Sequence, residues 1–278
     1  MSRIVKVLGV QTEPDTTDKQ ANLDKVERLL ADHAWFKPDL VVLPEVFNVG
    51  IVPPDVAIKS AEKVPGLTYE KMSGWAKAIN AYIVGGSIIE MCEDGLCRNN
   101  SILFGRDGKP ICNYYKQHMF NYYGSNEGEF NVAGNETVLA KTDIGNIGLT
   151  VCFDLRFTEL YRKLAENGAD IIVVPAAWPY PRLDHWVTLN KARAIENSCF
   201  IVAVNQVGLV PPKRINVGNS MVIDPWGSIV AGSGEKEAVM MAEIDLDQVS
   251  KLRYEFPLLK DRNMNAYANF KIYDATSN

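Results

Sequence analysis

Two short apolar segments with the same layout, one in each half of the chain, constrain the fold most. They are residues 39–44 (DLVVLP) and residues 170–175 (DIIVVP). A continuous apolar run of this length, rather than an alternating one, is typical of a strand that is buried on both faces. Both segments therefore predict central strands of sheets that are covered on both sides.

The elements around these two strands follow the same order in both halves. Residues 200–204 resemble the predicted strand 82–89, and residues 219–227 (NSMVIDPWG) resemble residues 100–108 (NSILFGRDG), in which Asp107-Gly108 predicts a hairpin turn. Three helices are predicted between these strands. Asp18 caps the first helix, and the other two lie near residues 69–79 and 157–167. Chance similarity between two αβ units is the alternative to a true repeat.

Two similar sheets that pack face to face, with helices outside, form a four-layer α-β-β-α sandwich, and this α/β fold is our prediction. No stretch rich in Pro, Gly or Ser separates the halves, so we predict a single domain over residues 1–278. Residues 207–217 are predicted to be an irregular loop. The tail, residues 252–278, has little periodicity and is predicted to pack at a subunit interface.

Charge and composition exclude several classes of partner. The formal net charge of -5 and the pI near 5.4 disfavour non-specific binding to nucleic acid or to anionic membranes.

The sequence shows no sign of export, disulfides or a metal site. No secretory signal or membrane span is predicted. The five cysteines have no framework spacing, and no histidine pairs with a cysteine at a metal-ligand spacing. Cys92 and Cys97 are expected to be reduced thiols rather than a disulfide across a hairpin. We expect a cytoplasmic protein without metal or cofactor.

Three residues at predicted strand ends suggest covalent catalysis. Cys152 follows an apolar strand and precedes a helix, and the carboxyl ends of strands gather ligand sites in α/β folds. Glu45 directly follows the first apolar run, and Lys116 closes the strand that ends at residue 115. Taken singly, each is weak evidence, because the alternatives are a buried inert thiol, a capping or salt-bridging acid and a solvated lysine. Together they provide a nucleophile, a base and an electrostatic stabiliser.

Three segments resemble the signatures of the nitrilase, or carbon–nitrogen hydrolase, superfamily: residues 43–45 (LPE), 115–120 (YKQHMF) and 150–157 (TVCFDLRF). The resemblance extends from the first strand to residue 246. It implies the α-β-β-α sandwich and a homodimer, or a higher homo-oligomer, in which the helix after the nucleophile forms part of the interface. It also implies that Glu45 is the general base, Lys116 the catalytic lysine and Cys152 the nucleophile. Glu127 matches the family's second glutamate, with Glu129 as the neighbouring alternative and an ordinary loop acid as the other interpretation.

Further strings resemble the omega-amidase-like branch of this superfamily. They are residues 152–161, 189–197 (LNKARAIEN) and 204–208 (VNQVG). This resemblance implies hydrolysis of a small monoamide of a dicarboxylic acid, such as 2-oxoglutaramate, to acid and ammonia through a cysteine thioester, without a cofactor. Two departures weaken the substrate assignment but not the reaction class: Thr158 stands where the branch usually has Pro, and residues 117–120 read QHMF rather than IHLF.

A substrate of this kind needs a hydrogen-bond donor for its oxyanion and a cation for its distal carboxylate. Phe153 would offer its backbone N–H to the oxyanion, Arg156 would bind the distal carboxylate, and the predicted pocket walls are Tyr122, Trp178 and His185. A salt bridge from Arg156 to Asp154 or Glu159 is the alternative for the arginine, and packing roles are the alternatives for Trp178 and His185.

Other functions stay open at this point. They are a carbamoylase or a nitrilase of the same superfamily, and a non-catalytic binding protein with the same fold. A serine hydrolase of the α/β type is excluded because the sequence has no Gly-x-Ser-x-Gly motif.

Overall fold

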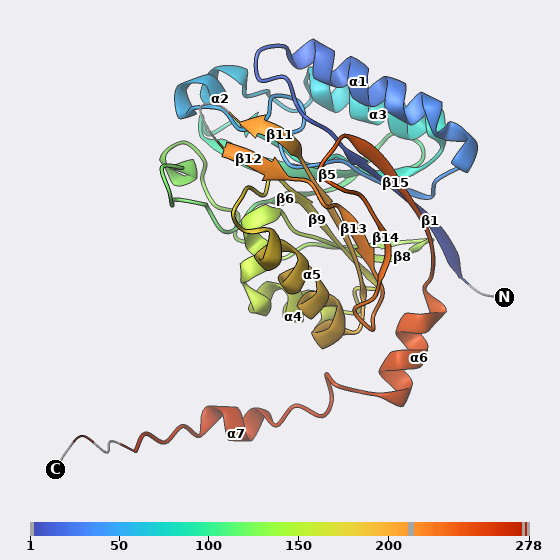
Figure 1. Cartoon of the computed structure of the whole chain (residues 1–278), viewed down its shortest axis with the longest axis vertical. Coiled ribbons are helices and arrows are strands. Elements are labelled where there is room, and N and C mark those ends of the chain that lie inside the picture. The colour runs from blue at the N-terminus through green and yellow to red at the C-terminus, as the bar shows by residue number, and fades with distance from the viewer. Residues whose placement is uncertain (1–2, 211–213, 274–275, 277–278) are drawn as a thin grey trace.

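The computed structural model describes residues 3–210, 214–273 and 276. In this part of the chain the strands form two large sheets and one hairpin (Figure 1). The first sheet contains, in spatial order, β15 (Ala238–Asp245), β1 (Ile4–Gln11), β2 (Leu40–Val42), β3 (Tyr82–Val84), β5 (Cys97–Phe104) and β4 (Ile88–Met91), and β6 (Pro110–Tyr115) also pairs with β5. The second sheet contains β14 (Ile229–Gly232), β13 (Met221–Ile223), β10 (Phe200–Asn205), β9 (Ile171–Ala176), β8 (Gly145–Leu149) and β7 (Leu139–Thr142).

The central strands of the two sheets have the same arrangement, which agrees with the repeat seen in the sequence. Three parallel strands, β1-β2-β3 in one sheet and β8-β9-β10 in the other, form each centre. An antiparallel strand flanks each centre on both sides: β15 and β5 in the first sheet, β7 and β13 in the second. The two apolar runs that predicted buried strands occupy equivalent positions, as β2 and β9.

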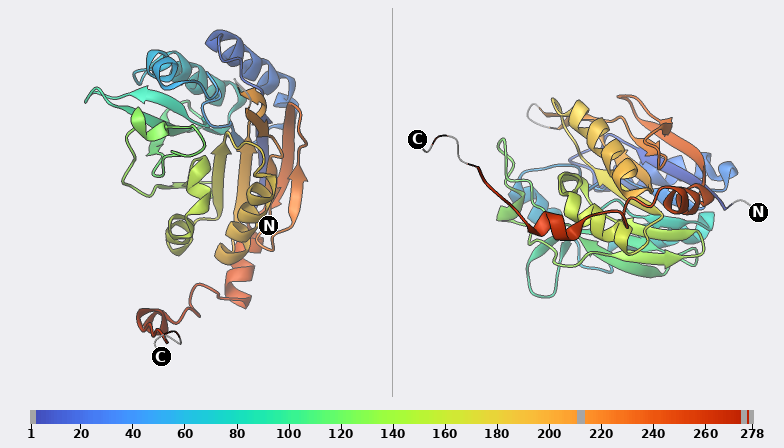
Figure 2. Two further views of the ribbon diagram at one scale, coloured as in Figure 1. Left: turned by 60° about the vertical axis from the view of Figure 1, so that its left-hand side comes forward. Right: turned by 90° about the horizontal axis from the view of Figure 1, so that it is seen from below.

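Four helices cover the outer faces of the two sheets (Figures 1 and 2): α1 (Lys19–Asp32) and α3 (Leu67–Ile79) on the first sheet, and α4 (Thr158–Glu166) and α5 (Leu183–Asn197) on the second. The other helices are α2 (Pro54–Ser60), α6 (Asp247–Glu255) and α7 (Met264–Ala268), with short 3-10 helices η1 (Ala34–Phe36), η2 (Glu127–Glu129) and η3 (Cys152–Arg156). None of the described helices combines the length and apolar character that a membrane span requires.

Alternation along β1 shows how the layers stack. Val5 and Val7 belong to the core cluster that contains both sheets and the buried residues of α4 and α5, whereas Leu8 and Val10 pack with residues of α1 and α3. Successive side chains of a strand point to opposite faces, so this alternation places one face of the sheet against helices and the other against the second sheet. The described elements therefore stack as helix, sheet, sheet and helix, which agrees with the predicted fold.

Two expected elements were wrong. The strand predicted over residues 82–89 is divided into β3 and β4, because Gly85-Gly86 turns the chain and Gly86 adopts a φ of +55°. The predicted loop 207–217 contains instead the hairpin of β11 (Val207–Val210) and β12 (Arg214–Val217), while residues 211–213 lie outside the described residues. Its pairing depends on contacts with the rest of the fold that the local sequence does not reveal.

The C-terminal segment begins to leave the body of the molecule later than predicted. Leu252, the first residue of the predicted tail, is buried on α6, so the tail starts after this helix. Beyond it the chain extends away from the sandwich (Figure 1), and Tyr267 and Phe270 are exposed. Its packing at a subunit interface stays a prediction.

Gly86 is required next to the strand end that carries Glu45. A Cβ atom at residue 86 would lie 1.9 Å from the carbonyl oxygen of Pro44, and the positive φ disfavours any L side chain. We expect Gly86→Ala to lower the free energy of unfolding by about 2 kcal/mol or more. Gly74→Ala is the control, because Gly74 is exposed within α3 and a Cβ there meets nothing within 4 Å. Urea unfolding compares the two, and equal midpoints would contradict the prediction.

Candidate active site

The proposed nucleophile lies in a sharp turn where a central strand ends. β8 ends at Leu149, and Cys152 begins the 3-10 helix η3 with a φ of +50°. Val46, next to Glu45, has a φ of +39°, which is unfavourable for a β-branched residue. Strained backbone of this kind clusters at functional sites, where the surrounding structure holds it in place. Both segments lie at the carboxyl ends of parallel strands.

Lys116 connects two carboxylates from different segments of the chain. Its ammonium nitrogen Nζ lies 2.9 Å from Oε1 of Glu45 and 2.7 Å from Oε2 of Glu127. The side chain of Lys116 is 2% exposed, and those of Glu45 and Glu127 are 3% and 11% exposed. Glu129, the alternative second glutamate, is exposed in the same short helix. The geometry thus selects Glu127 and not Glu129 as the partner of Lys116.

Neutral hydrogen-bond donors fix the orientation of both carboxylates. The side-chain amide of Asn99 donates to Oε1 of Glu45 at 3.0 Å and to Oε1 of Glu127 at 3.2 Å. The backbone N–H of Ala177 donates to Oε2 of Glu45 at 3.0 Å, and that of Phe120 donates to Oε2 of Glu127 at 2.9 Å. Each carboxylate oxygen in this cluster therefore accepts at least one hydrogen bond, which limits the rotation of the side chains.

The carboxylate of Glu45 is the ionisable group that acts most strongly on the thiol of Cys152. Burial, followed by the negative charge of Glu45, raises the pKa of Cys152 well above its ordinary value, and the Lys116 ammonium only partly opposes this. For Lys116 the balance is reversed: burial favours the neutral amine, but the carboxylates of Glu127 and Glu45 outweigh it and raise the pKa well above the ordinary lysine value. At neutral pH the site therefore holds a protonated thiol beside a carboxylate and a permanent cation.

Asp154 joins the turn at Cys152 to the strand that carries Lys116. Its buried carboxylate accepts hydrogen bonds from the hydroxyl of Tyr114 at 2.7 Å and from the backbone N–H groups of Val151 at 2.9 Å and His118 at 3.1 Å. It also lies 2.7 Å from Nδ1 of His118. Because these contacts reach both sides of the nucleophile, Asp154 holds Cys152 and Lys116 in a fixed relation.

The predicted substrate-binding residues lie around the same turn. Arg156 stacks on the rings of Trp178 and Phe153 and lies 3.1 Å from the ring nitrogen Nδ1 of His185. In the described part of the chain it forms no salt bridge with Asp154 or Glu159, so that alternative fails. Trp178 is buried and donates its indole N–H to the carbonyl oxygen of Arg182, whereas the rings of Tyr122 and Phe153 lie 5.9 Å apart.

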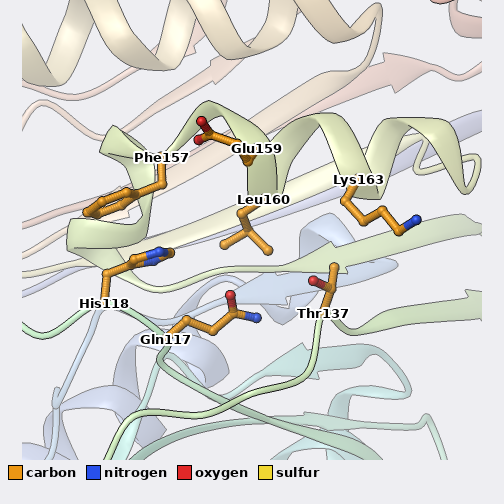
Figure 3. Close-up of a pocket in the computed structure, with 7 residues that line it drawn as sticks. All are labelled: Gln117, His118, Thr137, Phe157, Glu159, Leu160 and Lys163. Atoms are coloured by element: carbon orange, nitrogen blue, oxygen red, sulfur yellow. The ribbon is translucent and has the colours of Figure 1, made fainter. Parts of the chain in front are cut away.

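His118 also lines a separate surface cavity of about 450 Å³ (Figure 3). Its walls include Phe157, whose ring stacks on that of His118 at 3.6 Å, and Leu160 of α4. Glu45, Lys116 and Cys152 do not line it. This cavity is therefore not where the chemistry of the candidate site takes place.

Sequence reasoning missed several residues of the site. Asn99, the Ala177 N–H and Asp154 were not proposed as parts of it. The pair Asn99-Asn100 provides a signal in retrospect, because two adjacent amides are both buried in a strand that is otherwise apolar at its end. Nothing in the local sequence marks Ala177, since its contribution is a backbone N–H.

Comparisons with known proteins agree with this arrangement. The model of the carbon–nitrogen hydrolase family matches residues 7–254. A deaminated glutathione amidase of Synechocystis is 33% identical over 269 residues, covering 93% of this chain and 97% of that protein. A 2-oxoglutaramate amidase of Paenarthrobacter nicotinovorans is 33% identical, covering 94% and 90%.

A solved structure has the same fold. Nit3 of Saccharomyces cerevisiae, a member of branch 10 of the nitrilase superfamily, superimposes with a TM-score of 0.84 at 31% identity, covering 94% of this chain and 97% of that one. The family model and the relatives span nearly the whole sandwich, including the strand ends that carry Glu45, Lys116 and Cys152. This chain belongs to the carbon–nitrogen hydrolase family, within the nitrilase superfamily.

Proposed function

We propose that this chain is an amidase that cleaves a small, carboxylate-bearing amide, a monoamide of a dicarboxylic acid such as 2-oxoglutaramate, to the acid and ammonia. The observation that carries the proposal is the buried cluster in which Lys116 binds both Glu45 and Glu127, while the charges of Glu45 and Lys116 both act on the buried Cys152 thiol. Relatives named 2-oxoglutaramate amidase and omega-amidase support the substrate class.

The raised pKa of Cys152 determines the first step. Because the thiol is protonated at neutral pH, the nucleophile forms only as the reaction proceeds: Glu45 accepts the proton while Sγ of Cys152 bonds to the amide carbon. The carbonyl oxygen becomes an oxyanion, which the ammonium of Lys116 and the backbone N–H of Phe153 stabilise. Phe153 lies in the first turn of η3, where N–H groups have no partner within the helix.

The remaining steps return the site to its starting state. The protonated Glu45 gives its proton to the amide nitrogen as the carbon–nitrogen bond breaks, and ammonia leaves a thioester on Cys152. Glu45 then accepts a proton from water, whose oxygen attacks the thioester carbon. The carbon–sulfur bond breaks, the acid is released, and the proton on Glu45 returns to sulfur. Glu127 holds Lys116 in place and helps to order the water.

Arg156 is the proposed partner of the distal carboxylate. It belongs to the same turn as Cys152, and its guanidinium group has no carboxylate within 4.0 Å among the described residues. Its guanidinium carbon lies 5.8 Å from the ring centre of Phe153 and 4.8 Å from that of Trp178, so both rings support it by cation–π contacts. An unpaired, half-buried guanidinium beside the nucleophile suits a substrate that carries its own negative charge.

Ammonia release from a panel of amides, carbamoyl compounds and nitriles tests the proposal. We expect wild type to prefer 2-oxoglutaramate or a similar monoamide, and Cys152→Ala to lose activity by a factor of at least about 10⁴. Cys112→Ala is the matched control, because Cys112 lies on β6 outside the cluster. Carbon dioxide formed with the ammonia would identify a carbamoylase, and turnover of nitriles alone a nitrilase. Full activity of Cys152→Ala would refute the nucleophile.

A further inference from the structure

Arg156 is one of three arginines that converge near the nucleophile. Arg182 precedes α5 in the loop that follows β9, and Arg214 begins β12. Backbone hydrogen bonds join these two segments, from Tyr180 N–H to the carbonyl oxygen of Ile215 and from Val217 N–H to that of Trp178, each at 2.9 Å. The fold therefore holds the two additional arginines in a fixed relation to the Trp178 ring on which Arg156 stacks.

Aromatic residues attached to the catalytic cluster support these arginines. The Arg182 guanidinium lies 5.3 Å from the ring centre of Phe120, whose N–H binds Glu127, and 4.7 Å from that of Tyr123. Arg214 donates from Nη2 to the carbonyl oxygen of Tyr123 at 3.4 Å. Arg182 and Arg214 thus share Tyr123, whereas Arg156 contacts His185 and the ring of Phe153.

The three positive charges are not balanced by the protein. Over residues 3–210, 214–273 and 276, none of these three guanidinium groups has a carboxylate within 4.0 Å, whereas Arg98 and Arg193, for example, form salt bridges with Asp94 and Glu196. Burial, and then the neighbouring Arg182, lower the pKa of Arg156 and of Arg214 below the ordinary arginine value. The fold therefore keeps like charges together at a cost that an anionic ligand would relieve.

One distal carboxylate needs only one bidentate arginine. We infer that Arg182 and Arg214 form a second carboxylate-binding subsite, so that among carboxylate-bearing amides the site prefers those that carry two carboxylates. This inference rests on the proposed function, in which Arg156 binds the first carboxylate. The second carboxylate belongs either to the acyl part or to the amine part of the amide, and the probes below separate these cases.

Calorimetric titration of Cys152→Ala, which does not turn over, tests the subsite with three amides. Glutaramate carries one carboxylate, glutarylglycine carries a second one on the amine part, and 3-carboxyglutaramate carries a second one on the acyl part. We expect at least one of the two dianions to bind about tenfold more tightly than glutaramate at the same ionic strength. If neither dianion binds more tightly, the inference is overturned.

Further substitutions in the Cys152→Ala protein test whether the two arginines cause the tighter binding of the dianion. Arg182→Gln and Arg214→Gln should each bring the ratio of the dissociation constants of glutaramate and the dianion close to one. Arg182→Lys, which keeps the charge, should retain part of the tighter binding of the dianion. Arg28→Gln on α1 is the matched control, because Arg28 is exposed far from the site. A preference that survives both glutamine variants would overturn the subsite.

Turnover separates this inference from the proposed function. If wild type releases no ammonia from any amide but the arginine-dependent preference is present, the proposed function fails and the subsite stands. If wild type hydrolyses glutaramate or 2-oxoglutaramate without any preference for dianions, the proposed function stands and the subsite fails.

Discussion

Replacing Glu45 by Gln should lower kcat by about 10³- to 10⁴-fold while the protein remains folded. The carboxylate acts on the Cys152 thiol, whose pKa is raised well above its ordinary value by burial and by Glu45 itself. In the variant, burial still opposes formation of the thiolate, and no base remains to accept the proton from the thiol or from the attacking water, so both the attack and the hydrolysis of the thioester slow down. Steady-state ammonia release with the best substrate of the panel measures the loss.

The fold should tolerate this change because the amide of Gln has nearly the same shape. Its oxygen still accepts from Lys116 and Asn99, while its NH₂ group faces the Ala177 N–H, a mismatch that costs about 1–3 kcal/mol. Glu90→Gln is the matched control, since Glu90 is also buried in the first sheet but pairs with Asn100. Equal activities of the Glu45 and Glu90 variants would exclude Glu45 as the base.

The architecture was predictable because burial on both faces leaves a direct trace in the sequence. Residues 39–44 and 170–175 are apolar without alternation, as a parallel strand between two layers requires, and they became β2 and β9. The hairpin of β11 and β12 was not predictable in this way. Its local sequence contains two prolines and no strand-like run, and its position is fixed by distant contacts such as those with Tyr180 and Trp178.

The central part of the site was predictable for a different reason. Glu45, Lys116 and Cys152 each stand at a strand end, and three motifs in one order made their combination specific. Asp154 lies inside one of these motifs, yet its function as a connection between Tyr114, His118 and the turn appears only in three dimensions. Arg182 and Arg214 belong to no motif, and only folding brings them near Cys152.

Lys116→Met should cause the largest loss of stability among the changes considered. Lys116 is 2% exposed and neutralises two carboxylates, so its removal leaves Glu45 and Glu127 buried without a cation. Breaking a buried ion pair by removing one partner costs about 3–5 kcal/mol. Urea unfolding at pH 7 measures the difference, and Lys141→Met on the exposed surface of β7 should change the unfolding free energy by less than about 0.5 kcal/mol.

The difference in unfolding free energy between wild type and Lys116→Met should depend on pH, because the pKa of Lys116 is raised in the folded protein. Since the folded protein binds this proton more tightly than the unfolded chain, the stabilisation is fully present below the ordinary lysine pKa of 10.5 and is lost as the pH rises through the folded value. The difference between wild type and Lys116→Met should therefore be constant from about pH 7 to 9 and decrease above about 10.5. A difference that instead grows at high pH, or is absent at pH 7, would show that the ammonium does not hold the two carboxylates together.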